Sequence, residues 1–312
     1  MGRSSSPVGY GIGIAEVVGS NPTRSTIKLY YNSRMVNKFS SILTRSCYLR
    51  RTDNVFIHWI NNCTLLYFVN WQREISIKEI DGKKVVVKRN KISKNLHDYL
   101  IAISYNILSI LLAHPSAPPE LGNKMTSNEG TEMREKLRSI GIPTPSLILI
   151  SDNLLIEEFI PGGNLHEALS NGTDFSLAFS AGIITGRLHK SGYTFTDNKS
   201  QNFLVGSMRK VLRTDLAFIQ KKNSIFARSM DIGSFLGSLL GLDIRKYKVV
   251  QDAFCEGYYS EVKTPIPYLS IPLRNILGFG LSLSSNWVVN VLLESAKLVS
   301  YRRKFGFSVK SP

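Results

Sequence analysis

The chain has 312 residues, 43% of them hydrophobic, which excludes disorder throughout and is enough for two lobes that share a cleft. The formal net charge of +16 indicates attraction to something acidic, such as a nucleotide, a nucleic acid, an acidic protein or a membrane surface, without choosing among them. Three widely spaced cysteines fit neither a disulfide framework nor a zinc site, so we expect a reducing, cytoplasmic environment.

The first 34 residues are expected to contribute no packed core. They are rich in glycine and serine. Residues 19–22 can be back-translated into a DNA sequence that contains the T-arm consensus of a tRNA gene, and residues 3–6 into one that resembles the D-arm side of such a gene. We interpret residues 1–34 as a non-native, over-extended reading frame or as a disordered tail, with Met35 as the expected start.

A β-rich part follows, with strands predicted over 55–60, 64–69, 75–80 and 84–88. The pair Asp81-Gly82 separates the last two strands and is a strong signal for a tight hairpin turn. These patterns predict a twisted antiparallel sheet.

The next segments alternate between helix and strand. A helix is predicted over 96–113, and its apolar run is shorter than the ~20 residues that a membrane span needs. A second helix, over 127–140, should stop at Gly141-Ile-Pro-Thr-Pro145, because proline cannot continue it. Strands over 147–150 and 154–159 then lead to the linker Pro161-Gly-Gly163.

Beyond this linker the apolar spacing is helical. The predicted helices cover residues 175–188, 229–240, 246–258 and 286–302. The fold is therefore expected to be α+β, with a β-rich N-lobe over 35–160 and a helical C-lobe over 161–312.

The motif with the clearest chemistry is Asp197-Asn-Lys199-Ser-Gln-Asn202, followed by Asp215. It resembles the catalytic loop and the metal-binding aspartate of the protein-kinase-like superfamily. Other landmarks of that superfamily occur in the same order: Val85-Val-Val-Lys88 before the loop, and Asp231-Ile-Gly-Ser-Phe after it.

Two further stretches point to one branch of the superfamily. Lys88-Arg-Asn-Lys91 and Gly141-Ile-Pro-Thr-Pro145 resemble the small atypical kinases of the RIO and KEOPS-associated type and their lipopolysaccharide-kinase relatives, in their archaeal form. The resemblance implies a two-lobed kinase fold that transfers the γ-phosphate of ATP to a hydroxyl, most simply of protein Ser or Thr. The alternatives are a sugar or small-molecule kinase, and a nucleotide-binding pseudokinase or ATPase scaffold in an RNA-related complex or with an acidic protein.

The resemblance also implies ATP and magnesium as cofactors and assigns roles in the C-lobe. Asp197 would take up the proton of the acceptor hydroxyl, and Lys199 would lie beside the transferred phosphate. Asn202 and Asp215 would supply oxygen ligands to magnesium. Two residues, Asp231 and His189, are expected to support the loop structurally.

In the N-lobe, Lys88 would hold the α- and β-phosphates, and Glu129 would orient Lys88 through an ion pair, with Glu132 as the competing choice. Met133 favours Glu129, since it provides an apolar neighbour one turn later on the same predicted helix. The backbone of residues 158–159, Glu158 and Phe159, would meet the adenine.

The chain departs from the kinase pattern in three places. Phe195-Thr196 replaces the usual histidine before the catalytic aspartate, and Ala217 replaces the glycine after the metal-binding one. Asn61-Asn-Cys-Thr64 stands where a glycine-rich phosphate loop would be expected, so the sequence shows no backbone cradle for phosphate.

Overall fold

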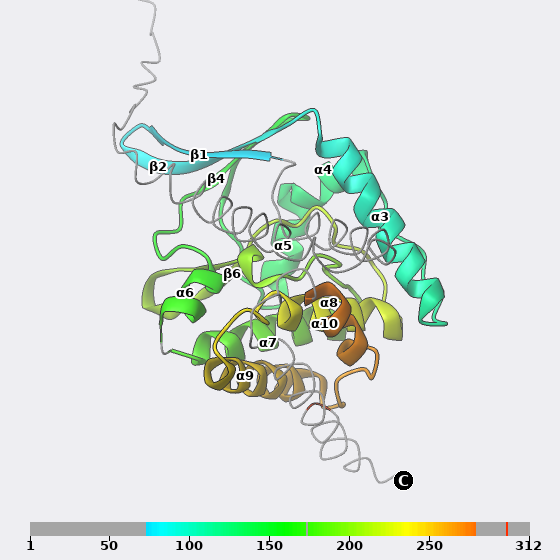
Figure 1. Cartoon of the computed structure of the whole chain (residues 1–312). Coiled ribbons are helices and arrows are strands. Elements are labelled where there is room, and N and C mark those ends of the chain that lie inside the picture. Colours follow the sequence, from blue (N-terminus) through cyan, green and yellow to red (C-terminus); the bar gives the residue numbers. More distant parts are fainter. Residues whose placement is uncertain (1–72, 173, 279–297, 299–312) are drawn as a thin grey trace, which may run out of the picture.

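The computed structural model describes residues 73–172, 174–278 and Leu298. The predicted extension 1–34, the strands over 55–60 and 64–69 and the loop between them lie outside the described residues, as does nearly all of the helix predicted over 286–302. Within the described residues an antiparallel sheet is followed by a helical part (Figure 1), so the predicted α+β, two-lobed arrangement is confirmed.

The sheet has four antiparallel strands in the order β1-β2-β4-β3. Their bounds are β1 Arg73–Ile80, β2 Lys83–Asn90, β3 Leu147–Ile150 and β4 Leu154–Glu158. Asp81 and Gly82 both adopt positive φ angles, of 50° and 72°, as the tight turn between β1 and β2 requires. The register opposes Ile75 to Lys88 on these two strands.

Three helices connect the two halves of the sheet. They are α3 (Lys94–Leu111), which lies along one side of the molecule in Figure 1, α4 (Asn123–Glu129) and α5 (Thr131–Ser139). The single helix predicted over 127–140 is thus wrong in its first part, because Gly130 has extended backbone angles (φ −73°, ψ 178°) and separates α4 from α5. No described helix is long and apolar enough to cross a membrane.

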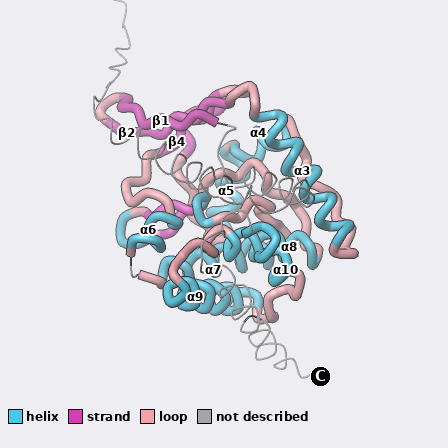
Figure 2. The backbone as a smooth tube through the Cα atoms, viewed as in Figure 1, coloured by secondary structure: helices cyan, strands magenta, loops and turns pink. Residues whose placement is uncertain are grey.

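The helical part holds the main core. Its elements, drawn as cyan tubes in Figure 2, are α6 (Leu165–Asn171), α7 (Ser176–Lys190), α8 (Ile225–Gly237), α9 (Ile244–Val262) and α10 (Ser270–Gly278). Helix α7 packs on α9, and α8 packs on α10. Helices α7, α8 and α9 match predicted ones within a few residues, whereas α6 and α10 were not predicted.

Between the two parts runs a short hairpin of β5 (Phe203–Val205) and β6 (Val211–Arg213). A turn of 3-10 helix, η1 (Ser200–Asn202), precedes β5, and a second, η2 (Ser207–Arg209), lies in the connection between the strands. Leu204 pairs with Leu212, and Phe203 is fully buried in the core of the helical part. This hairpin fixes the separation between the Asp197–Asn202 loop and Asp215.

Candidate active site

A buried aspartate of α8 anchors the loop that carries Asp197. The two carboxylate oxygens of Asp231 accept hydrogen bonds from the backbone N–H groups of Phe195 and Thr196, both at 2.7 Å. His189 Nε2 lies 2.9 Å from Asp231 Oδ2. Thr196 has a positive φ of 65°, a conformation that costs free energy for a β-branched residue and that these hydrogen bonds help to hold. The structure therefore places both predicted support residues, Asp231 and His189, directly behind the loop.

The side chains of Asp197, Lys199 and Asn202 lie together at this loop. Lys199 Nζ is 3.1 Å from Asp197 Oδ2, and the Asn202 side-chain amide donates to the same oxygen at 3.1 Å and to the Asp197 carbonyl at 2.9 Å. Asp197 is 1% exposed, and its Oδ1 has no hydrogen-bond partner among the described residues. A buried carboxylate oxygen without a partner is costly, which is typical of an oxygen kept for a ligand or a reacting group.

Arg213, which the sequence interpretation missed, ties this loop to the strand before Asp215. Its guanidinium donates to the carbonyls of Asn202 at 2.8 Å, Asp197 at 2.7 Å and Asp215 at 3.4 Å. The Arg213 side chain is fully buried and lies over the ring of Phe195, with Cζ 4.3 Å from the ring centroid. One cation thus sets the positions of both aspartates.

Asp215 lies in a strongly cationic environment. Burial alone would raise the pKa of its carboxyl, but the surrounding cations, Arg73, Lys88, Lys199 and Arg213, outweigh burial and hold that pKa below its usual value. The residue also has a positive φ of 58°, a sparsely populated conformation that is common at functional sites. Asp215 is therefore held ionised, in the form that can bind a metal ion.

The donor set at Asn202 and Asp215 fits magnesium. Both side chains supply hard oxygen atoms, and magnesium is usually held by one or two carboxylates together with phosphate oxygens and water. Asp197 Oδ1, which has no hydrogen-bond partner among the described residues, is a further buried oxygen on the residue that Asn202 contacts.

Lys88 is held by a glutamate that the sequence interpretation did not single out. Its Nζ lies 2.6 Å from Glu157 Oε1 and 2.9 Å from Thr214 Oγ1, and Thr214 in turn donates to Glu157 at 2.9 Å. Arg134 Nη2 contacts the second oxygen of Glu157 at 3.0 Å. Burial opposes ionisation of Glu157, yet Lys88 and Arg134 outweigh it and lower the pKa of its carboxyl.

The predicted ion pair between Lys88 and Glu129 is therefore replaced by one between Lys88 and Glu157. Glu129 instead contacts Arg73 at 3.2 Å and Arg134 at 3.4 Å, and its Oε1 accepts from the backbone N–H of Leu216 at 3.2 Å. The prediction placed Glu129 within one continuous helix that also contained Met133. Gly130 instead ends α4 at Glu129, so Glu129 and Met133 do not lie one turn apart on the same helix. The competing residue Glu132 is exposed on α5.

Arg73 completes a continuous chain of charges across the site. Its Nη1 bridges Glu129 Oε1 and Asp215 Oδ1, at 3.2 and 3.5 Å. Burial alone would lower the pKa of Arg73, but these two carboxylates outweigh burial and raise it. No motif in the sequence marked Arg73, although a basic residue just before an apolar strand near the expected phosphate loop was a signal that could have been used.

The expected adenine-binding segment lies at the end of β4. The Glu158 N–H donates to the Ser146 carbonyl at 2.9 Å, and the Ser146 N–H donates back to Glu158 Oε2 at 3.1 Å. The Glu158 amide is thus already bonded within the protein, so this amide does not offer a free donor to adenine. Phe159 follows β4 and is half-buried.

Comparison with known proteins gives two similar archaeal sequences. One is a probable bifunctional tRNA threonylcarbamoyladenosine biosynthesis protein of Methanocaldococcus jannaschii, 22% identical over 201 residues, which are 62% of this chain and 36% of the relative. Another is a probable serine/threonine-protein kinase BUD32 homolog of Archaeoglobus fulgidus, 23% identical over 135 residues, 42% of this chain and 66% of the relative. The resemblance to small archaeal atypical kinases is confirmed. No protein-family model matches the chain.

Both matches leave much of the sequence uncovered. The chain spans about a third of the length of the first relative and just under two thirds of the second. What either relative does as a whole protein therefore reaches this chain only as a proposal.

Proposed function

We propose that the protein binds ATP with magnesium and transfers the γ-phosphate to a hydroxyl group. The observation that carries this proposal is the arrangement of Asp197, Lys199 and Asn202 on one loop, joined through Arg213 to an ionised Asp215. Phosphoryl transfer needs mainly positioning and neutralisation of charge, and this site contains ordered groups for both.

Each residue has a distinct task in this proposal. One oxygen of Asp197 contacts Lys199, and the other has no hydrogen-bond partner in the described part of the chain; this carboxylate would orient the acceptor hydroxyl and accept its proton. Lys199 would stabilise charge on the phosphate that is transferred. Asn202 and Asp215 would hold magnesium, which supplies charge neutralisation to the phosphate oxygens when bound.

Protein serine or threonine is the acceptor that we propose first, because one similar protein is named as a serine/threonine-protein kinase homolog. A sugar or another small molecule is the alternative acceptor within the same chemistry. A second candidate function is ATP hydrolysis within an RNA-related complex. The RNA part of this candidate is favoured by the name of the other relative, which refers to tRNA, and by the net charge of +16.

The test is transfer of label from γ-labelled ATP by the wild type and by Asp197→Ala, Asp215→Ala and the exposed control Glu135→Ala. Loss of a proton-accepting or metal-binding carboxylate should lower the rate by roughly 100-fold or more, whereas the control should match the wild type. Acceptors should include the protein itself, a basic protein and a panel of carbohydrates, with free phosphate measured in parallel.

The pattern of products separates the candidates. Label on protein supports the serine/threonine kinase, label on a carbohydrate supports the small-molecule kinase, and free phosphate without an acceptor supports the ATPase. Background signals of equal size in the wild type and both aspartate variants would overturn the proposal.

A further inference from the structure

Arg73 enters the site from the same face of the sheet as Lys88. It is the first residue of β1, where Ile75 lies opposite Lys88 and Arg73 lies opposite Asn90. Residues two apart on a strand share a face, and directly paired residues on neighbouring strands share it too. The strand geometry therefore places two cations on one face of the β1–β2 hairpin, one from each strand.

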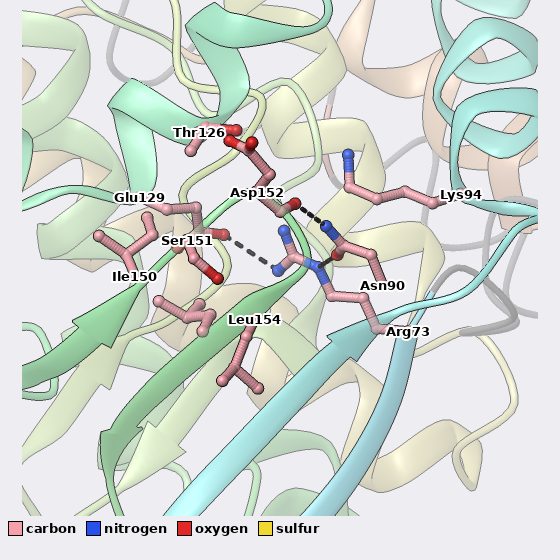
Figure 3. A pocket seen from close by; sticks show the side chains of 10 residues that line it. Arg73, Asn90, Lys94, Thr126, Glu129, Ile150, Ser151, Asp152 and Leu154 are labelled. Carbon is pink, nitrogen blue, oxygen red and sulfur yellow. Dashed lines mark hydrogen bonds and ion pairs between the residues drawn. The ribbon is translucent and has the colours of Figure 1, made fainter.

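Among the described residues, the Arg73 guanidinium is held by contacts of 3.2–3.5 Å that use only two of its three nitrogen atoms. Its Nε donates to Asn90 Oδ1 at 3.2 Å, while Nη1 alone makes both contacts to the carboxylates of Glu129 and Asp215. Figure 3 shows this side chain beside Glu129 and Asn90 at a pocket that Lys94 and Thr126 also line. Within the part of the chain that the structure describes, Nη2 makes no hydrogen bond, so half of the guanidinium fork is left for another acceptor.

Lys88 is held by shorter contacts. Its Nζ lies 2.6 Å from Glu157 Oε1 and 2.9 Å from Thr214 Oγ1, and the side chains of Lys88 and Arg73 are buried to a similar degree, 8% and 9% exposed. An ammonium group has three N–H donors, so Lys88 can keep Glu157 while it contacts a phosphate. The two cations can therefore bind phosphate together.

We infer that Arg73 is a second cation, beside Lys88, that binds the phosphates of the nucleotide. This inference rests on the proposed function, namely that the site binds ATP. The sequence has no glycine-rich stretch at 61–64, and a guanidinium from the start of β1 can bind phosphate through two parallel hydrogen bonds.

The contact between Arg73 and Asp215 explains how Arg73 can be released to bind phosphate. In the free protein Arg73 compensates the charge of Glu129 and Asp215. A magnesium ion on Asp215 would take over that compensation, which frees the guanidinium for the phosphates that arrive with the metal. Glu129 would remain as the group that orients Arg73.

The experiment is calorimetric binding of ATP, ADP and adenosine in the presence of magnesium. The variants are Arg73→Ala, Arg73→Lys and Lys88→Ala, with Arg89→Ala as the matched control, because Arg89 is exposed on the neighbouring strand. For Arg73→Ala we expect roughly 10-fold to 100-fold weaker binding of ATP and ADP and unchanged binding of adenosine. Arg73→Lys should lose less, and Lys88→Ala should also weaken the binding of ATP and ADP.

The outcomes distinguish the inference from the function on which it rests. If the wild type binds ATP no better than adenosine, the proposed function itself fails. The inference is overturned if the wild type prefers ATP but Arg73→Ala and Arg73→Lys bind ATP as well as the wild type or more tightly. Arg73 would then only stabilise the structure or compete with magnesium for Asp215. Should Arg73→Ala not fold, as judged by circular dichroism, Arg73→Lys compared with Arg89→Ala decides.

Discussion

Glu157 is a buried carboxylate whose charge is tolerable only because of its neighbours. One of its oxygens meets Lys88 and Thr214, and the other meets Arg134. All of these partners come from separate segments, namely β2, α5 and the residue after β6. This one side chain therefore connects the sheet, the helix behind it and the strand that leads to Asp215.

Replacing Glu157 with glutamine should destabilise the fold by about 3 kcal/mol, because two buried cations would lose their shared charged partner. The measurement is the free energy of unfolding from urea titration, with Glu135→Gln on the exposed face of α5 as the control. A variant as stable as the control would mean that Lys88 and Arg134 do not depend on this carboxylate.

The same residue predicts part of the pH dependence of stability. Because the pKa of Glu157 is lower in the folded protein, the unfolded chain binds more protons in the range between the two pKa values. The stabilisation by Glu157 is then fully present above the pKa of an ordinary glutamate and is lost as pH falls toward the lower, folded value. The stability difference between the wild type and Glu157→Gln should therefore shrink as the solution is acidified below that ordinary pKa. A difference that stays constant or grows on acidification contradicts the assignment.

At the scale of elements, the crossing of α7 and α9 depends on glycines. A Cβ atom added to Gly257 of α9 would lie 2.0 Å from the carbonyl oxygen of Phe179, and one added to Gly182 of α7 would lie 2.2 Å from that of Phe254. Both obstacles are backbone atoms, which cannot rotate away as a side chain can. The two helices must therefore approach this closely for α7 to place the loop that follows it.

Gly257→Ala should destabilise the protein even though alanine favours a helix over glycine. The gain in helix propensity is roughly 0.5–1 kcal/mol, whereas forcing helices apart in a packed core costs about 1–3 kcal/mol. Unfolding by urea, compared with Glu256→Ala on the exposed face of the same helix, gives the sign. A net stabilisation would show that α7 and α9 separate without cost.

The sequence predicted those elements and site residues that depend on local pattern. The run from Asp197 to Asp215 spans one loop and one hairpin, so its spacing could be recognised directly. The ion pairs of Arg73 could not be, since its partners Glu129 and Asp215 lie 56 and 142 residues away. Helix α6 was missed although Asn164 caps it by accepting from the Glu167 N–H, because seven residues are too few to show a helical period.

For the molecule as a whole, the charge of +16 contrasts with the balance inside the site. There, the cations Lys88, Arg134 and Arg73 alternate with the carboxylates of Glu157, Glu129 and Asp215 along one chain of contacts. These buried charges compensate one another and contribute little to a long-range field. The excess positive charge lies elsewhere on the chain and is available to attract an acidic partner.

If that partner is RNA, as the second candidate function proposes, binding should depend steeply on salt. Each phosphate that a lysine or arginine neutralises releases a counterion, so the logarithm of the association constant should fall linearly with the logarithm of salt concentration. We expect transfer RNA to bind in low salt and its affinity to drop by about 10-fold or more between roughly 50 and 200 mM salt. Fluorescence anisotropy with labelled tRNA at several salt concentrations measures this slope. Undetectable binding in low salt, or an affinity that is independent of salt, would count against an RNA partner.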